Sequence, residues 1–329
     1  MRDDYLDISK AILIFLVVFG HFLERLMGWS DLNNHVLLGT IYFIHMPAFI
    51  MISGMLYKDR NYFKNILFFL SLYIPFQIAL PLFDSIWTGK FHWQWNIFER
   101  PYWILWYLLG MIVWTLLTHL FIKLKLSKPI IMLTALTLSL LVGYSTWNNY
   151  QYSVGRIFVF FPFFIIGFVY GKSILSRIQQ HKFNVIFAFI ILITIASLLK
   201  YSHLSEYWLY GSLSYQQLKV SEINGTLIRL GCFTVSCLGI YAFFSLMKLF
   251  QSRFIQLGRN TLPVYLLHGF LVIALSNYLK LETNFFFEIL ICFVLSVFVC
   301  YVLQQNFFDQ ALRKLSLWLM KPTEKLWKK

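Results

Sequence analysis

Long apolar stretches recur along the whole of this 329-residue chain, and they decide what it can fold into. A helix needs roughly 18–25 mostly apolar residues to cross the hydrocarbon core of a bilayer. Only 13% of the residues are charged, about half the share in soluble domains. We therefore expect an all-α integral membrane protein with about ten transmembrane helices, drawn at residues 8–28, 36–57, 63–83, 101–121, 130–147, 153–171, 184–200, 223–247, 261–279 and 285–307.

The basic residues are distributed unevenly between the connecting segments. The formal net charge is +14, which by itself would also suit a nucleic-acid-binding protein. Most of the 28 lysines and arginines, however, fall in every second loop and in the tail after the last span. Cytoplasmic loops of membrane proteins carry this excess. The pattern excludes nucleic acid as a partner and predicts that both termini are cytoplasmic, because an even number of spans returns the chain to its starting side.

The ends of the chain and its cysteines carry little chemistry. The first ten residues are polar and partly acidic and no small-residue cleavage site follows, so we expect the first span to be retained. Residues 1–307 are predicted to form the transmembrane domain, and residues 308–329 a basic amphipathic tail on the anionic inner leaflet. The four cysteines lie inside spans without metal-binding spacing, so no metal is expected.

The two longest outer loops are rich in aromatic residues. Residues 84–100 contain Trp and His, and residues 201–220 contain Tyr and Ser. Such rings either anchor a protein at the membrane interface or offer faces on which sugars stack. Interface anchoring is the commoner use, and the sequence leaves both interpretations open.

The first span has one polar edge. Lys10 and His21 are eleven residues apart, which places them on one stripe of a helix, separated along its axis by about 16 Å. Asp7, Glu24 and Arg25 fall within about 60° of that stripe. Ionisable groups at membrane depth are costly, and they usually face a cavity and mark function. Glu24 and Arg25 could equally form a simple interfacial pair, whereas the deeper His21 points to function.

The second span also contains a histidine at depth. His45 lies about nine residues from the outer end of the span, close to the expected depth of His21. Pro47 follows it and removes one backbone hydrogen bond, which produces a kink in a membrane helix. A kink beside a buried imidazole suits the wall of a cavity.

Three later spans contribute further polar candidates. His268 lies about one-third of the way into the ninth span, with Tyr265 one turn before it. The alternative for His268 is a structural hydrogen bond to a neighbouring helix. Arg156 and Arg229 each lie within two turns of an outer end, where an arginine either extends to the interface or binds carboxylate, phosphate or sugar oxygens.

These residue types favour group transfer. Histidine can accept a proton from a hydroxyl group at neutral pH, and a nearby carboxylate orients it and stabilises its charge. A cation at the cytoplasmic entry suits a phosphorylated donor that arrives from that side. The pattern therefore indicates transfer from a cytoplasmic donor to an acceptor reached from the membrane or from outside, without naming the transferred group.

Several motifs match a known family. "DISKA" followed by "VVFGHF" resembles the opening of the membrane acyltransferase-3 family, where an Asp-x-x-Arg/Lys-Ala stretch precedes a histidine of the first helix. "FIHMPAFIMISG" is similar to the pattern on that family's second helix. "WILWYLLG", "RIFVFFPFFIIGFVYG" and "LGRNTLPVYLLH" are similar to its later landmarks. The matches extend from residue 7 to about residue 270, and they are nearest to the fucose 4-O-acetylase-like branch.

The resemblance implies an O-acyltransferase. Such a protein moves an acetyl or similar acyl group from cytoplasmic acyl-CoA, here with acetyl-CoA as co-substrate, to a hydroxyl of a cell-envelope polysaccharide or lipid-linked sugar. Its partners would be the acyl-CoA donor, the glycan acceptor and membrane lipids. It would be a multi-pass protein of the cytoplasmic membrane of a bacterium.

The resemblance also suggests roles for the candidate residues. The catalytic histidine of the family falls on His21, which Glu24 would polarise. The position associated with the donor falls on Lys10, and the second-helix histidine, with a binding or orienting role, falls on His45. We assign the remaining candidates around these, with Asp7, Arg156, Arg229 and His268 on the donor side and Trp103, Trp106 and Tyr265 beside His45 on the acceptor side.

Two other classes of protein remain as alternatives. A secondary transporter or flippase for an envelope glycan or small anion would use the same residues as a proton or substrate relay, but transporters often show internal repeats, and we find none. A scaffold for envelope assembly would not need the buried histidines. Labelling of a glycan that depends on acyl-CoA separates the enzyme from both.

Overall fold

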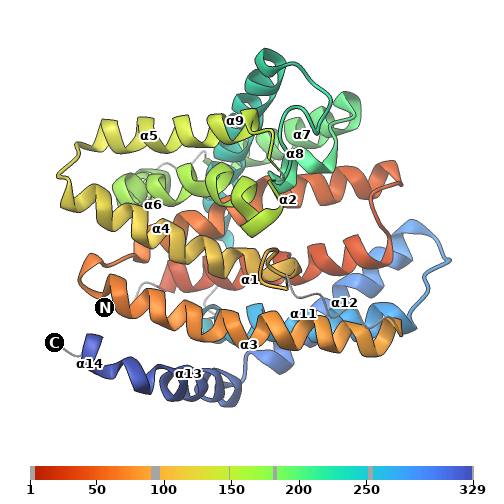
Figure 1. Cartoon of the computed structure of the whole chain (residues 1–329). Coiled ribbons are helices and arrows are strands. Elements are labelled where there is room, and N and C mark those ends of the chain that lie inside the picture. Colours follow the sequence, from red (N-terminus) through yellow and green to blue (C-terminus); the bar gives the residue numbers. More distant parts are fainter. Residues whose placement is uncertain (1–3, 90–96, 148, 181–183, 251–254, 328–329) are drawn as a thin grey trace.

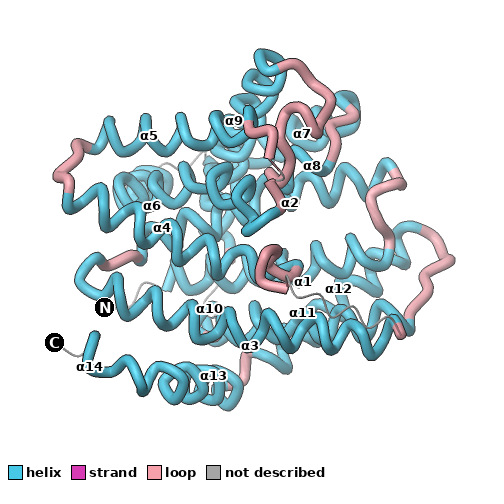
Figure 2. Tube along the Cα trace, viewed as in Figure 1, coloured by secondary structure: helices cyan, strands magenta, loops and turns pink. Residues whose placement is uncertain are grey.

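The computed structural model describes residues 4–89, 97–147, 149–180, 184–250 and 255–327, and this part of the chain is helical without a β-strand (Figures 1 and 2). Nine of its helices are long and apolar enough to cross a membrane. The prediction of an all-α membrane protein is confirmed. The nine are α1 (Asp4–Leu26), α2 (Leu32–Leu56), α3 (Tyr62–Thr88), α4 (Trp106–Lys123), α6 (Val154–Gln180), α7 (Asn184–Ser202), α9 (Glu222–Leu246), α11 (Thr261–Tyr278) and α12 (Phe285–Leu303).

The predicted span at 130–147 is a shorter apolar segment. Helix α5 (Lys128–Leu141) continues as a 3₁₀ turn (Val142–Tyr144), and the two together cover Lys128–Tyr144. Seventeen helical residues measure about 25 Å, somewhat less than the hydrocarbon core. Figure 1 shows α5 running back alongside α6, so it returns the chain to the end of the bundle where α6 begins. A tenth crossing of the membrane by this segment stays a prediction.

The remaining helices lie outside the predicted spans. They are α8 (Glu206–Tyr210), α10 (Ile255–Arg259), α13 (Asn306–Met320) and α14 (Glu324–Trp327). The predicted tail is thus mostly α13, which packs on α3 and α11 and joins α3 through a 2.6 Å hydrogen bond between Ser71 and Ser316. Figure 1 shows the start of α1 and helix α14 at the same end of the bundle. That this end faces the cytoplasm stays a prediction.

Two glycines bring α2 and α6 into backbone contact. A Cβ atom added to Gly167 would lie 1.9 Å from the carbonyl oxygen of Met51, and one added to Gly54 would lie 1.9 Å from that of Phe164. Small residues at such crossings let membrane helices approach closely and gain packing energy. This contact fixes the position of α2, which carries His45 and Tyr42, relative to α6, which carries Arg156.

The loop between α7 and α9, which the sequence predicts to lie on the outer side, folds back over the helix ends. Ser205 caps α8 by accepting a hydrogen bond from the amide of Tyr207, and Gly211 ends it in a left-handed conformation with φ 63°. Trp208 and Tyr215 of this loop are buried, so they are not interface anchors. The Trp- and His-rich segment of the other aromatic loop, residues 90–96, lies outside the described residues.

Replacement of Gly167 by alanine tests the α2–α6 contact. A methyl group there has no space, so we expect Gly167→Ala to lower the free energy of unfolding by at least the roughly 1–3 kcal/mol that is typical of overpacking. Gly231→Ala in α9 is the matched control, because nothing lies within 4 Å of its added Cβ. Thermal unfolding in detergent would compare the two, and equal melting temperatures would contradict the close contact.

Candidate active site

A small polar cavity of about 60 Å³ lies between the helices near the Arg25 end of α1. It is bounded by α1, α2, α4, α6, α8 and the 3₁₀ turn Trp103–Leu105 that precedes α4. The structure brings six of the predicted site residues to its wall, namely His21, Glu24, His45, Trp103, Trp106 and Arg156.

His21 and Glu24 form an ion-pair contact on α1. Nδ1 of His21 lies 3.4 Å from Oε2 of Glu24, because the two residues are three positions apart and share one face of the helix. Both side chains are mostly but not fully enclosed. With Nδ1 turned to the carboxylate, Nε2 is the nitrogen that can accept a proton, and the negative charge of Glu24 stabilises the imidazolium that results.

Two tyrosines hold the carboxylate of Glu24. The hydroxyl of Tyr42 on α2 donates to Oε2 over 2.6 Å, and the hydroxyl of Tyr210 on α8 donates to Oε1. Trp29 donates in turn to the Tyr210 oxygen over 2.8 Å. Burial and the charge of Glu24 raise the pKa of Tyr210 well above its usual range, so the phenol stays a donor. Glu24 is therefore kept ionised and immobile beside His21.

His45 is oriented by the backbone of its own helix. Its Nδ1 lies 2.8 Å from the carbonyl oxygen of Ile41. A carbonyl can only accept, so Nδ1 carries the proton and Nε2 is left as an acceptor or a second protonation site. The ring also packs edge-on against Tyr42, with centroids 4.8 Å apart. His45 thus has a defined tautomer at the wall of the cavity.

His268 of α11 stacks on His21. The two ring centroids lie 5.4 Å apart with an interplanar angle of 18°. Nδ1 of His268 donates to the carbonyl of Val264, 2.9 Å away, and Nε2 is buried without a hydrogen-bond partner in the described part of the chain. The alternative, a hydrogen bond from His268 to a neighbouring helix, is not found among the described residues, since Nδ1 is bonded within its own helix and Nε2 has no partner there.

Trp103 separates the cavity from the space outside it. Its ring lies edge-on to His21, with centroids 4.7 Å apart, and the guanidinium of Arg25 sits 4.7 Å above its centre. Its backbone has φ 41°, a left-handed conformation that a bulky residue adopts at a cost of roughly 1–3 kcal/mol. Such strain persists where the surrounding packing enforces it, and it often marks functional sites.

Arg156 closes the cavity on the side of α6. Its guanidinium lies 5.6 Å from the ring centre of Trp106 and 5.3 Å from that of Tyr210. Nε is buried without a hydrogen-bond partner among the described residues. The side chain therefore offers unused donors beside the aromatic wall of the cavity.

Tyr265 lies behind the cavity wall. Its hydroxyl donates to the carbonyl oxygen of Ile104 over 2.5 Å, and its ring packs against Tyr107 at 5.3 Å. The hydroxyl is thus used to fasten α11 to the turn before α4. The predicted contact of Tyr265 with an acceptor is a packing role in this structure.

Lys10 and Asp7 are not part of the cavity. Lys10 Nζ lies 2.6 Å from Asp7 Oδ1, and Arg259 Nε lies 3.4 Å from Asp7 Oδ2. Asp7 is 2% exposed, so two cations flank one buried carboxylate where α10 meets the start of α1. The stripe that joins Lys10 to His21 in the sequence thus has its two ends in different sites.

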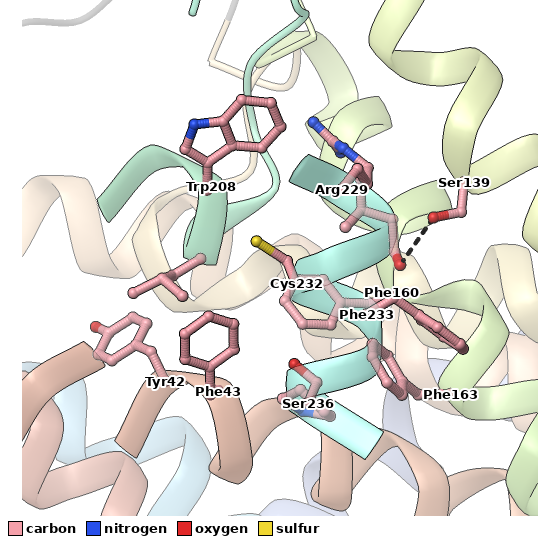
Figure 3. Close-up of a pocket in the computed structure, with 13 residues that line it drawn as sticks. Tyr42, Phe43, Ser139, Phe160, Phe163, Trp208, Arg229, Cys232, Phe233 and Ser236 are labelled. Atoms are coloured by element: carbon pink, nitrogen blue, oxygen red, sulfur yellow. Dashed lines mark hydrogen bonds between the residues drawn. The ribbon is translucent and has the colours of Figure 1, made fainter. Parts of the chain in front are cut away.

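Arg229 lies in a neighbouring pocket (Figure 3). Tyr42 and Phe160 line both spaces, and Arg229 stands on the far side of them. It is 4% exposed, so extension to the membrane interface is wrong for this residue. Its Nη2 donates to Leu213 over 3.3 Å and its guanidinium faces Trp208 at 5.5 Å, which ties α9 to the outer loop. Figure 3 shows the guanidinium on the Trp208 side and away from Phe43.

Sequence reasoning missed the tyrosines that hold Glu24. Tyr42 precedes His45 by three residues, so helical spacing alone could have placed it on the same face. Tyr210 belongs to the aromatic outer loop, which was expected either at the membrane interface or on a sugar. Trp29 directly follows the first span, and nothing in the sequence indicated that it would lie near Glu24. Among the described residues, no group of three or more His, Cys, Asp or Glu side chains is placed to hold a metal ion.

Comparison with known proteins finds a matching family model and a curated relative. A family model described as an acyltransferase domain matches residues 3–305. The nodulation protein NolL of Sinorhizobium fredii is 29% identical over 211 residues, which cover 57% of this chain and 54% of that protein. The chain thus spans about half the length of this curated relative. No solved structure matches it.

Removal of the Tyr42 hydroxyl tests the anchoring of Glu24. A hydrogen bond to a charged group contributes about 1.5–3 kcal/mol, so we expect Tyr42→Phe to reduce the free energy of unfolding by this amount. Tyr144→Phe is the matched control, because its hydroxyl bonds Thr226 at the exposed surface and its loss should cost little. Reversible unfolding in mixed detergent micelles measures both. Equal losses would show that the carboxylate does not depend on Tyr42.

Proposed function

The chain belongs to the family defined by this acyltransferase domain, and on that premise we propose that it is a membrane O-acetyltransferase. It would transfer an acetyl or similar acyl group from cytoplasmic acyl-CoA to a hydroxyl of a cell-envelope polysaccharide or lipid-linked sugar. The observation that carries the proposal is the enclosed pair of His21 and Glu24, whose carboxylate is held by Tyr42 and Tyr210.

The reaction follows from that pair. Nε2 of His21 takes the proton of the acceptor hydroxyl while the hydroxyl oxygen attacks the carbonyl carbon of the thioester. The C–O bond forms, the C–S bond breaks, and the thiolate of CoA receives the proton back from His21. Glu24 stabilises the imidazolium between these steps and keeps its charge throughout. The ring of His268 stacks on the imidazole of His21 and limits its movement.

The donor would enter from the Lys10 end of α1. There Lys10 and Arg259 flank Asp7 and supply two cations for the phosphates of CoA. Lys10 and His21 are separated along the helix by about 16 Å, a distance that the extended pantetheine arm of CoA can bridge. A donor held at this end would therefore present its thioester to the cavity from the side opposite Trp103.

The acceptor would approach across the aromatic wall. Trp103 and Trp106 line the cavity, and indole faces suit the apolar face of a sugar ring. His45, with its Nε2 free, would orient the hydroxyl groups beside the one that reacts. Assignment to the fucose 4-O-acetylase-like branch and location in the cytoplasmic membrane of a bacterium are part of this proposal.

Replacement of His21 tests the chemical role. A positioned general base contributes about 10²–10⁴-fold, so we expect His21→Ala to lower turnover of acetyl-CoA by this factor and to leave acetyl-CoA binding intact. Glu24→Gln should lower turnover as well, since the neutral amide cannot stabilise the imidazolium. The measurement uses purified protein in nanodiscs with radiolabelled acetyl-CoA.

The matched control is His203→Ala, because His203 is exposed in the outer loop. It should retain turnover. Full activity in His21→Ala would contradict the role of His21 as base. Failure of the wild-type protein to bind acetyl-CoA would contradict the assignment of acetyl-CoA as the donor and would favour a transporter instead.

Replacement of Lys10 tests the donor end. Loss of one charge-assisted contact to phosphate should raise the KM for acetyl-CoA about tenfold and leave kcat nearly unchanged. Lys200→Gln, at an exposed position of α7, is the control. An unchanged KM in Lys10→Gln would mean that the pair of Lys10 and Asp7 serves only to fasten the start of α1.

A further inference from the structure

A second and larger pocket adjoins the cavity of His21. It measures about 350 Å³, and Trp103 and Arg156 line both spaces. This outer pocket, here called the vestibule, is also lined by Arg25, Arg100 and Tyr150. It lies at the Arg25 end of α1, opposite the ion-paired cluster of Lys10. A molecule in the vestibule is therefore one side chain away from the catalytic pair.

Aromatic rings hold the three guanidinium groups of the vestibule in place. Arg25 lies 4.7 Å above Trp103, and Arg100 lies 4.1 Å above Tyr150. Arg156 lies within 6 Å of two rings, as described above. Stacking of this kind fixes the plane of an arginine and leaves the N–H groups at its rim free to donate. The vestibule thus presents guanidinium N–H donors whose orientation is set by the aromatic rings, rather than mobile charges.

The positive charge of the vestibule is not balanced by its own walls. No carboxylate lines it in the described part of the chain, and no salt bridge involves Arg25, Arg100 or Arg156 there. Two acids lie close to it without lining it. Glu24 is held in the inner cavity by two tyrosines beside His21, and Asp84 lies behind the vestibule wall, where it accepts a 2.6 Å hydrogen bond from Tyr102, a lining residue that also interacts with Arg25.

We propose that the vestibule binds an oxyanion carried by the acceptor, a phosphate or carboxylate attached to the sugar whose hydroxyl enters the cavity. The inference rests on the proposed function and narrows its substrate class to anionic glycans. Three arginines that form no salt bridge among the described residues, at the edge of a membrane-embedded cavity, attract and orient an anion far better than a neutral sugar. Arg156, first assigned to the donor, then serves the acceptor, because it lies at the end opposite Lys10.

The shape of the site supports this direction of binding. The inner cavity of about 60 Å³ is much smaller than the vestibule of about 350 Å³, so the bulk of a charged sugar has more room in the vestibule. Trp103 stands between them in its left-handed conformation. An anion held by Arg25 and Arg100 would set the distance at which the sugar meets Trp103 and His21.

Binding of small sugars without a donor tests the inference. The probes are glucose 1-phosphate, glucuronic acid and neutral glucose, titrated calorimetrically into the protein in phosphatidylcholine nanodiscs at low ionic strength. We expect the wild-type protein to bind at least one anionic sugar at least tenfold more tightly than glucose. Preference for glucose 1-phosphate would indicate a phosphate-bearing, lipid-linked acceptor, and preference for glucuronic acid would indicate a polymer that contains uronic acids.

The double variant Arg25→Gln/Arg100→Gln removes two of the three charges at exposed positions. It should bind the preferred anionic sugar at least tenfold more weakly, with unchanged affinity for glucose and an unchanged melting temperature. Arg313→Gln on α13, whose arginine pairs with Asp309, is the matched control and should bind like the wild type.

Three results would overturn the inference, namely equal affinity for the charged and neutral sugars, equal affinity in the double variant and the wild type, or no binding of any probe at millimolar concentration. Because no acyl donor is present, these results are independent of whether acyl transfer is found. Loss of turnover in His21→Ala, together with no preference of the wild-type protein for an anionic sugar, would support the proposed acyltransferase and overturn the proposed anion site.

Discussion

The arrangement of the site depends on one buried carboxylate. A charge inside an apolar bundle is tolerated only with partners, and Glu24 obtains hydrogen bonds from Tyr42 on α2 and Tyr210 on α8 and an ion-pair contact with His21 on its own helix. Satisfying this charge therefore draws the outer loop down onto the first two helices. The same contacts enclose the imidazole and give it a fixed orientation, so a structural requirement of the membrane interior also prepares the proton acceptor.

Close helix packing and local strain complete that preparation. The crossing of α2 and α6 without side chains at Gly54 and Gly167 sets the spacing between the helix of His45 and the helix of Arg156. The left-handed backbone of Trp103 turns its indole between His21 and Arg25. Packed interiors of this kind do not deform gradually, and they hold the groups around a reacting atom at constant distances. The polar cavity owes its small size to this packing.

The two charged regions at the ends of α1 differ in a way that suits two substrates. At one end, Lys10 and Arg259 share the buried carboxylate of Asp7, so the local charge is largely compensated. At the other end, the arginines of the vestibule lie on aromatic rings without acidic partners among the described residues. The cavity of His21 and Glu24 lies between these two regions along α1. The proposal that donor and acceptor bind at opposite ends of α1 rests on this difference.

The sequence by itself determined the fold class, the positions of the spans and the face of α1 that carries His21 and Glu24, because hydropathy and helical period act over short distances along the chain. It also indicated His45, in "FIHMPAFIMISG", and Trp103 and Trp106, in "WILWYLLG", because both stretches resemble motifs of the family. Only the tertiary structure decided which distant groups meet. Tyr210 reaches Glu24 from 186 residues away, and Arg229, expected in the same site, lies behind the wall formed by Tyr42 and Phe160. Such contacts depend on how helices cross and how loops fold back, and no local pattern records either.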